Sequence, residues 1–297
     1  MDIEKKFVDK IPVDKLYEDL FQPGLKKAGQ ALETVIEFGM TILLPVKLVN
    51  EKINLRFKKH LIAYNKKLDA VDEKKICQVP ENIGLPILDK FTFLSQEDLA
   101  DAFTNLLAKA SSFDTVNLVH PSFLSTLDCL CGDEARILKH FKDSERIPVI
   151  DLYVDRSDEK IPKPDFYNSQ GAKTRDQLMA QIDYQFQDRN TVSIKAAWNL
   201  TGIEKFVQLD FPENIYIYID NLTRQGIISF QRSQYAATDA HIYAAFEESI
   251  YVQEIERLKK WTSQLQSTDQ KSEFRIAKGF IEFTDYGKAF IKACIKA

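Results

Sequence analysis

The stretch from Ser95 to Lys142 contains three consecutive helix signals, and it constrains the fold more than any other part of the chain. Ser95 is followed three residues later by Asp98, a spacing typical of a capped helix start. Behind them, apolar residues recur at helical intervals of three and four. These are Leu99, Phe103, Leu106, Leu107 and Ala110. We therefore predict an amphipathic helix whose apolar face packs on a core.

Two further helices are predicted after the first. Pro121 favours a first helical turn, and Gly132 is expected to end this helix. His120 is expected to be a capping residue or a loop donor at the helix entry. The next helix should begin at Asp133 and Glu134. Its last part carries the basic residues Lys139, His140 and Lys142. Acids at the start and bases at the end suit the helix dipole.

Three runs of residues in this region, DLADAFTNLLAKA, HPSF and DEARIL, occur together in one known family. With them the chain resembles the abortive infection alpha (Abi-alpha) family of bacterial proteins, which are associated with phage defence. The resemblance extends from about Tyr17 to the C-terminal third of the chain. It implies a role in antiviral defence but no particular reaction, because no catalytic residues accompany these motifs.

The chain has 297 residues, of which 44% are hydrophobic, so it can form one large domain or two ordinary ones. We predict two: residues 1–118 as a helical domain and residues 119–297 as a second domain. The net charge of −4 gives no overall attraction to nucleic acid. Four cysteines in so long a chain indicate a reducing compartment, and the first ten residues lack the features of a secretion signal. The expected location is the cytoplasm.

Residues 28–50 are the most apolar stretch, and they allow two interpretations. Their length approaches that of a spanning helix, but Glu33, Glu37 and Lys47 would each be costly within a bilayer. The first interpretation is a core helix interrupted at Pro45. The second is a conditional membrane segment of a protein that is cytoplasmic or peripheral to the inner membrane, with Glu33 and Glu37 on one helical face that lines a polar or oligomeric surface. Its lipid-facing residues would be Val35, Ile36, Phe38, Ile42 and Leu43.

The helix predicted next is strongly basic. Its charged residues are Lys52, Arg56, Lys58, Lys59, Lys66 and Lys67. This charge suits an anionic membrane leaflet, but it also suits a solvated face of a helix whose apolar side packs inward. His60, within this helix, is expected to be solvated. Beyond it, residues 71–93 contain Pro80, Gly84 and Pro86, so we expect a loop or a short extended connection there.

The second half of the chain mixes strand and helix signals. Strands are predicted over residues 147–154, 227–231 and 274–283, and helices over residues 174–187, 213–226, 238–265 and 285–295. The helix that ends at Gly226, the two strands after it and the closing helix resemble a winged helix. The predicted fold class is mainly α (α+β). An N-terminal helical domain is followed by a winged-helix-like domain with a long helical insertion in the wing.

A winged helix raises the question of DNA binding. The predicted recognition helix carries two acids, Glu213 and Asp220, against one base, Arg224, which is unfavourable beside a phosphate backbone. Arg232, Arg275 and Lys278 of the wing would add a small basic footprint, or they are ordinary surface residues. We therefore do not expect nucleic acid as a partner. The alternative is a regulator or nucleic-acid sensor that binds through Arg224, Arg232 and Lys278.

The sequence contains no phosphate loop and no dinucleotide-binding glycine motif. Cys129, Cys131 and His140 lack a fourth zinc ligand. Four carboxylates lie close together in the sequence, those of Asp151, Asp155, Asp158 and Glu159. They could bind a hydrated cation, or they could belong to a solvated loop. We predict no catalytic, cofactor-binding or metal-binding residues.

The sequence therefore predicts a non-enzymatic anti-phage protein. In this hypothesis the C-terminal domain senses or holds a partner and keeps residues 28–50 packed until their release disturbs the inner membrane. The expected partners are a phage-derived trigger or a host protein, an anionic membrane surface and a second copy of the chain. No cofactor is expected. A third hypothesis, a hidden nuclease, depends on Asp151 and Asp155.

Overall fold

The computed structural model describes residues 25–42, 50–144, 146–158, 192–232, 243, 256, 260 and 270–296. For residues 37–42, 156–158, 192–196 and 270–274 it describes the backbone alone. The chain divides into two compact units. The first comprises Met1–Glu145, Val207–Ser229 and Phe283–Ala297, and the second comprises Arg146–Phe206 and Phe230–Glu282. The domain boundary predicted at residue 118 falls inside the first unit, and it stays a prediction.

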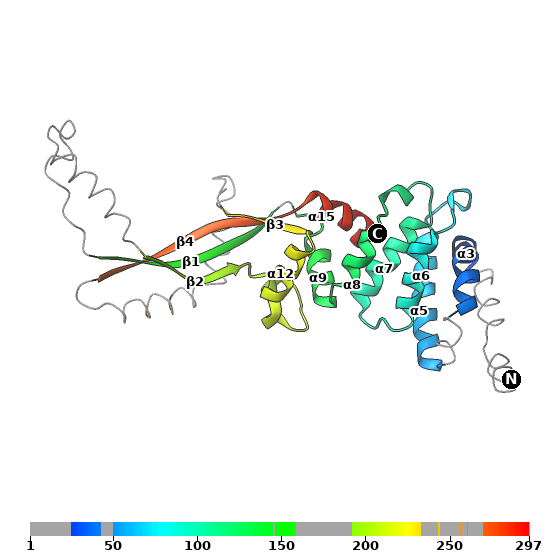
Figure 1. Cartoon of the computed structure of the whole chain (residues 1–297), viewed down its shortest axis with the longest axis horizontal. Helices are drawn as coiled ribbons and strands as arrows, with labels where there is room; N and C mark the ends of the chain where they lie inside the picture. The colour runs from blue at the N-terminus through cyan, green and yellow to red at the C-terminus, as the bar shows by residue number, and fades with distance from the viewer. Residues whose placement is uncertain are drawn as a thin grey trace, which may run out of the picture. The chain divides into compact units, whose positions relative to one another are not determined.

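The first unit is helical, and its helices α5, α6, α7 and α8 lie side by side (Figure 1). Its N-terminal part contains α3 (Lys26–Ile42), α5 (Glu51–Leu68), η2 (Glu73–Lys75), α6 (Glu81–Phe91), α7 (Glu97–Ala110), η3 (Val116–Leu118), α8 (Ser122–Asp128) and α9 (Gly132–Phe141). Later parts of the chain add η4 (Pro212–Asn214), α12 (Ile215–Arg224), α15 (Asp285–Phe290) and the π-helical turn η6 (Ile291–Ile295).

The central helix of this unit is α7, which packs against α5, α6, α8, α9 and η6. Every apolar residue that the sequence placed on its inner face is buried. Thr104 and Asn105 are buried as well, so α7 is enclosed on more than one side. The Asn105 side-chain amide donates a hydrogen bond to the carbonyl oxygen of Cys294 (2.9 Å). This bond joins the C-terminal turn η6 to the centre of the unit.

The loop expected over residues 71–93 is wrong for residues 81–91, which form α6. Pro86 lies inside this helix and leaves one helical hydrogen bond unmade. Four side chains on one face, Ile83, Ile87, Leu88 and Phe91, are buried in the core of the unit. Their burial offsets the low helix propensity of a glycine and a proline.

Gly132 was expected to end a helix, and this prediction is wrong. The preceding helix, α8, already ends at Asp128, and Gly132 is the first residue of α9. A Cβ atom at Gly132 would lie 3.3 Å from Cδ of Gln96, at the start of α7. The glycine therefore permits close packing of α9 against the beginning of α7.

The expected end of α12 at Gly226 is confirmed. Gly226 has a φ of +71°, a backbone conformation that glycine adopts without strain. The Thr284 hydroxyl donates to the Gly226 carbonyl oxygen (2.5 Å). Close by, a Cβ atom at Gly287 would lie 2.0 Å from the carbonyl oxygen of Ile227. These contacts fix the start of α15 against the end of α12.

The second unit is built on strands β1 (Ile147–Asp158), β2 (Val192–Leu200) and β4 (Gln270–Phe283), with the short helix α11 (Ile203–Phe206). Together with β3 (Ile228–Gln231) the strands form a sheet of order β2-β1-β4-β3. Figure 1 shows β1 and β4 as a long pair, which is antiparallel and in continuous register from Ile147↔Ile281 to Asp158↔Gln270. β2 pairs antiparallel with the other edge of β1.

The mainly α (α+β) class is confirmed by these two units. The three predicted strands and the helix before Gly226 are present, as is the closing helix. The helix predicted over residues 174–187 lies outside the described residues. Of the helix predicted over residues 238–265, the structure describes residues 243, 256 and 260, and each is helical.

Candidate functional site

Lys27 fastens the start of α3 to the end of α5. Its ammonium group donates hydrogen bonds to the carbonyl oxygens of Leu68 (3.1 Å), Asp69 (3.2 Å) and Val71 (2.6 Å). Carbonyls at the C-terminal end of a helix lack partners within the helix and carry partial negative charge. One cation therefore satisfies three backbone acceptors and holds α3 in place. We call this set of bonds the Lys27 clamp.

Further polar contacts lie along α3. The Lys26 ammonium pairs with the Glu73 carboxylate at 2.6 Å, and this bond lowers the pKa of Glu73. Both side chains are exposed, so the pair contributes little to stability. The backbone N–H of Val79 donates to the carbonyl oxygen of Ala31 (2.9 Å) and joins the chain before α6 to the middle of α3.

The apolar face of α3 is enclosed by the first unit. Its buried residues are Ala28, Ala31, Leu32, Val35 and Ile36, each at most 2% exposed. Glu33 lies on the exposed side of the helix. This part of α3 therefore has the character of the core helix in the first interpretation of residues 28–50.

The structure places some of the residues that were predicted to face lipid. Val35 and Ile36 are buried in the protein, so either side chain can touch lipid only after α3 leaves its position. Phe38 and Ile42 belong to α3, but their side chains lie outside what the structure describes, as does the whole of Leu43. Within the described parts of the chain, every helix is too short or too polar to cross a bilayer.

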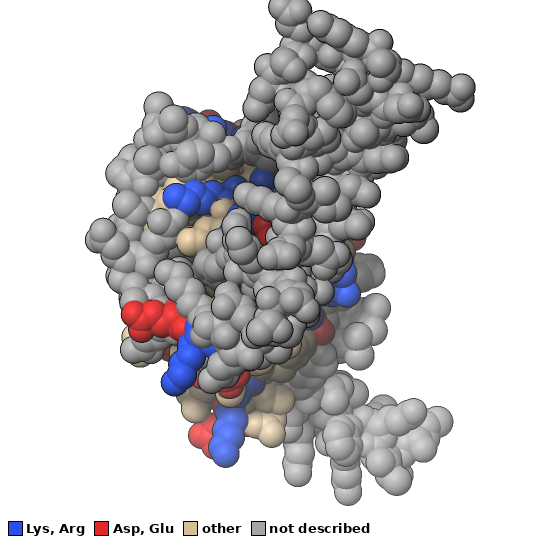
Figure 2. Space-filling model, turned by 90° about the vertical axis from the view of Figure 1, so that its left-hand side faces the viewer, with Lys and Arg blue, Asp and Glu red and all other residues tan. Residues whose placement is uncertain are grey.

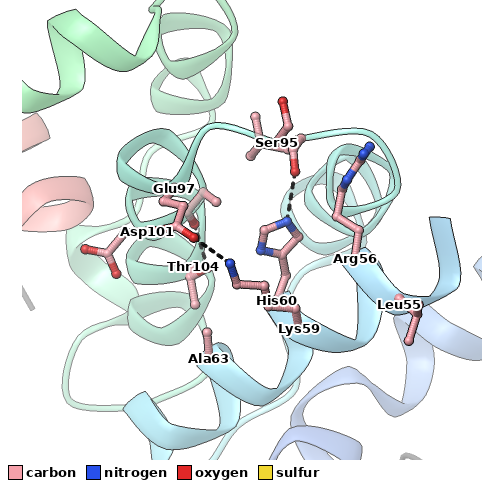
Figure 3. Close-up of a pocket in the computed structure, with 11 residues that line it drawn as sticks. Leu55, Arg56, Lys59, His60, Ala63, Ser95, Glu97, Asp101 and Thr104 are labelled. Atoms are coloured by element: carbon pink, nitrogen blue, oxygen red, sulfur yellow. Dashed lines mark hydrogen bonds and ion pairs between the residues drawn. The ribbon is translucent and has the colours of Figure 1, made fainter. Parts of the chain in front are cut away.

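A groove of ≈ 460 Å³ lies between α5 and α7 (Figure 3). His60 lies in its wall and is 7% exposed, so the expectation of a solvated histidine is wrong. Its Nε2–H donates to the Leu94 carbonyl oxygen (3.0 Å), and its ring packs on Phe91. Burial lowers the pKa of His60, which keeps the ring neutral at physiological pH.

Ion pairs border this groove. The Lys59 ammonium meets the Glu97 carboxylate at 2.6 Å, as Figure 3 shows, and Lys67 meets Asp101 at the same distance. Each pair joins α5 to α7. The positive charges of α5 near the groove are thus partly neutralised by α7, which the sequence of α5 alone does not reveal.

Asp133, at the start of α9, gathers hydrogen bonds from a distant part of the sequence. Its carboxylate accepts from the backbone N–H groups of Asp210 (2.9 Å) and Phe211 (3.0 Å) and from the Tyr218 hydroxyl (2.8 Å). Burial acts to raise the pKa of Asp133, but these bonds together hold it below its ordinary value. Burial and the bond to Asp133 raise the pKa of Tyr218 to about 12.

Glu134 lies beside a second pocket, of ≈ 630 Å³, between α12 and the connection from α8 to α9. Its two carboxylate oxygens accept from the backbone N–H of Cys131 (2.7 Å) and from the Asn221 side-chain amide (2.7 Å). Burial raises the pKa of Glu134. The sequence placed Glu134 in a first helical turn, but its bond to α12 is a tertiary contact that no local pattern predicts.

The comparisons with known proteins identify the family. A family model described as abortive infection alpha matches residues 50–294. The chain belongs to this family. No curated protein and no solved structure matches it significantly. Membership of the Abi-alpha family indicates a general role in abortive infection and antiviral defence, and α3 lies before the matched residues.

The basic residues of the nucleic-acid alternative each have a neighbour in this Abi-alpha protein. Arg224 donates to the Asn221 side-chain oxygen (3.0 Å), in the first unit. In the second unit Arg232 pairs with Asp151, and the Lys278 ammonium lies 5.5 Å from the centre of the Tyr243 ring. On the face drawn in Figure 2, the described Lys and Arg side chains are interspersed with Asp and Glu side chains.

The carboxylates of the nuclease hypothesis lie in β1, where arginines pair with them. Asp151 is 5% exposed and also accepts from the backbone N–H of Asn199 (2.9 Å). Asp155 pairs with Arg275 at 2.7 Å. The side chain of Asp158 and the whole of Glu159 lie outside the described residues. Asp151 and Asp155 thus serve as partners of arginines that join neighbouring parts of the sheet.

The cysteines considered as zinc ligands lie at the start of α9 or just before it. Cys131 is the N-cap residue of α9, where its side chain accepts from the backbone of Glu134. Cys129 precedes it and is exposed. Among the described residues no three His, Cys, Asp or Glu side chains are grouped in a way that would hold a metal ion. The N-cap residue of α8 is Pro121, so the prediction that His120 caps this helix is wrong. His120 lies one residue earlier, and its Nδ1 accepts from the backbone N–H of Ser122 at the helix entry (3.2 Å).

Proposed function

We propose that this Abi-alpha protein acts in abortive infection without catalysing a reaction. In this proposal α3 is held in the first unit of a cytoplasmic protein until infection. A phage-derived or host partner then releases it, and residues 28–50 disturb the inner membrane. The observation that carries the proposal is the Lys27 clamp, which holds an enclosed apolar helix at one end through bonds that a competing partner can replace.

We call the state in which α3 is packed in the first unit the closed form. Its energy supports a conditional mechanism. Burial of a Val, Leu or Ile side chain contributes about 1.5–3 kcal/mol, and Leu32, Val35 and Ile36 of α3 are buried in the first unit. Spontaneous release is therefore rare. A partner shifts the equilibrium only if it binds the released form more tightly than the closed form. The trigger must then contact surfaces that α3 covers, or α3 itself.

Substitution of Lys27 by Met tests this proposal, because it removes the clamp and keeps most of the side chain's apolar volume. Hydrogen exchange should become faster in α3, and expression in cells with a membrane-potential dye should cause depolarisation without phage. Lys26→Met is the matched control, since it removes an exposed ion pair on the next residue. The membrane step is wrong if Lys27→Met frees α3 by hydrogen exchange while cells keep their potential and their full protection from phage.

The proposal also includes a winged-helix-like part that contacts a protein partner. α12, β3, β4 and α15 follow one another in the order helix, strand, strand, helix, although a long stretch separates the two strands. We assign this part a protein-contact role, because the candidate DNA-binding residues Arg224, Arg232 and Lys278 each have a partner within their own unit. A shift of labelled DNA at physiological salt that is lost in Lys278→Gln would contradict this assignment.

A further inference from the structure

The outer face of α5 combines lysines with exposed aliphatic residues. Five residues recur at intervals of three and four, and all are exposed: Lys52, Leu55, Lys59, Ile62 and Lys66. Leu55 is 63% exposed and Ile62 is 49% exposed. At these intervals the five side chains share one narrow face of the helix. We call this face the α5 stripe.

The opposite face of α5 is the one that packs in the core. Phe57, Leu61, Tyr64 and Leu68 are each at most 2% exposed. Folding of the first unit therefore uses this inner face and leaves much of the Leu55 and Ile62 side chains exposed. A third large apolar side chain, that of Phe93, is 51% exposed in the turn after α6. The guanidinium of Arg56 donates to the Phe93 carbonyl oxygen (3.0 Å) and links this turn to α5.

We propose that the α5 stripe docks the protein on an anionic bilayer surface. The ammonium groups of Lys52 and Lys66 would bind lipid phosphates, while Leu55 and Ile62 enter the interface between headgroups and acyl chains. Lys59 pairs with Glu97 (2.6 Å), so its charge is partly neutralised and contributes less to this docking. Lysine stems can lie along apolar surface with their charges in the headgroup layer. The occupant is a bilayer because it offers both negative charge and an apolar phase, whereas a nucleic-acid backbone offers no apolar phase to the two aliphatic residues.

This inference rests on the proposed function, because it takes a membrane as the site of action. It adds which surface of the protein binds that membrane. Residues 43–50 connect α3 to α5, and a segment of that length extends at most ~29 Å. The hydrocarbon core of a bilayer is about 30 Å thick. Docking through α5 would thus keep residues 28–50 within reach of the membrane, both before and after the release of α3.

Flotation of the full-length chain with vesicles tests the docking surface. Vesicles of phosphatidylglycerol and phosphatidylethanolamine should bind the chain, and phosphatidylcholine vesicles should bind it at least tenfold more weakly. Lys52→Gln with Lys66→Gln should reduce the partition coefficient roughly 25-fold, since each lysine near an anionic surface contributes about fivefold. Leu55→Ser with Ile62→Ser should also reduce binding at least tenfold.

The control variant Lys74→Gln with Lys292→Gln removes the same charge from exposed positions outside α5 and should bind like the wild type. Circular dichroism melts confirm that each variant is folded. Equal binding to neutral vesicles, or unchanged binding of the Leu55/Ile62 variant, would overturn the proposal. The proposal would also be overturned if the same lysines proved to hold a nucleic acid or a second copy of the chain at physiological salt.

The two proposals fail in distinguishable ways. Docking predicts that the wild-type chain, with the Lys27 clamp intact, binds dye-filled anionic vesicles without releasing the dye. Release of α3 predicts that Lys27→Met binds and causes leakage. Absence of binding overturns the α5 surface alone, whereas binding without leakage in Lys27→Met, once hydrogen exchange shows α3 to be free, overturns the membrane action of residues 28–50 alone.

Discussion

Val35 of α3 packs directly over Gly84 of α6. A Cβ atom built on Gly84 would lie 2.7 Å from Cγ2 of Val35, closer than two carbon atoms can approach without a shift. A valine is stiff about χ1, so its methyl groups cannot easily rotate away. The absence of a side chain at Gly84 thus permits the close packing of α3, and the two residues are coupled.

Gly84→Ala should loosen α3. Alanine favours a helix over glycine by about 1 kcal/mol, but overpacking against Val35 costs about 1–3 kcal/mol, so we expect a small net loss of stability with faster hydrogen exchange in α3. Val35→Ala with Gly84→Ala should restore slow exchange, because the clash is removed. If the double variant exchanges faster than both single variants, the steric account of this contact is incorrect.

His60 should make stability depend on pH. Burial, opposed by the bond to Leu94 and assisted by Lys59, lowers its pKa in the folded chain below the ordinary 6.5. As pH falls below 6.5 the unfolded chain binds a proton that the folded chain does not, so the free energy of unfolding decreases until the folded pKa is passed. Each unit by which the pKa of His60 is lowered in the folded chain reduces the free energy of unfolding at acidic pH by about 1.4 kcal/mol.

His60→Gln provides the comparison, because its amide can still donate to the Leu94 carbonyl while the side chain cannot titrate. Urea denaturation at pH 7.5 and pH 5.5 should show a smaller loss of stability in this variant than in the wild type. Equal losses in the two proteins would mean that His60 titrates alike in the folded and unfolded chain.

Asp133→Asn should destabilise the first unit by about 2–3 kcal/mol, because a buried carboxylate that accepts three hydrogen bonds becomes an amide with one acceptor oxygen. Tyr218→Phe removes one of these bonds and should cost about 1 kcal/mol. Chemical denaturation measures both changes. The pKa of Asp133 is lowered in the folded chain, so its contribution is present above pH 3.8 and is lost as pH falls through the folded pKa. Equal effects of the two variants would contradict a central role for Asp133.

Arg232→Gln should cost roughly 1–3 kcal/mol, because it leaves the buried carboxylate of Asp151 without its cation. Arg275→Gln is the matched control in the same sheet. The Arg275 side chain is 49% exposed, and loss of its pair with Asp155 should cost at most about 1 kcal/mol. Thermal denaturation of the two variants tests the difference, and a similar loss in both would show that burial of Asp151 does not govern the pair.

Several elements could be predicted because the information is local. The apolar residues of α5 and α7 recur at helical intervals, and Gly226 supplies the backbone conformation that ends α12. Helix α6 could not be predicted in this way. Gly84 and Pro86 disfavour a helix locally, and only the fit of Gly84 beneath Val35 and the burial of one apolar face make the helix favourable. Propensity is a weak preference that tertiary packing overrides.

The candidate sites also divide into those that local sequence indicates and those that only tertiary contacts create. The sequence pointed to residues 28–50 and to the basic helix after them, because both stand out in composition. It contained no signal for the tertiary contacts of Lys27, His60 or Asp133. The hydrogen-bond partner of His60 is 34 residues away in the sequence, those of Lys27 are at least 41 residues away and those of Asp133 at least 77. The roles of the three residues therefore depend on which distant segments pack against them.

The sequence by itself determined the family, the mainly helical class and the amphipathic character of its clearest helices, since these depend on local spacing and motif. Only the tertiary structure decided which apolar residues are enclosed and which are left on the surface. It buries Val35 in α3 and leaves Leu55 exposed in α5, although both are aliphatic residues in helices. The physical reason is that burial depends on which surfaces meet, and those surfaces come from segments far apart in the chain.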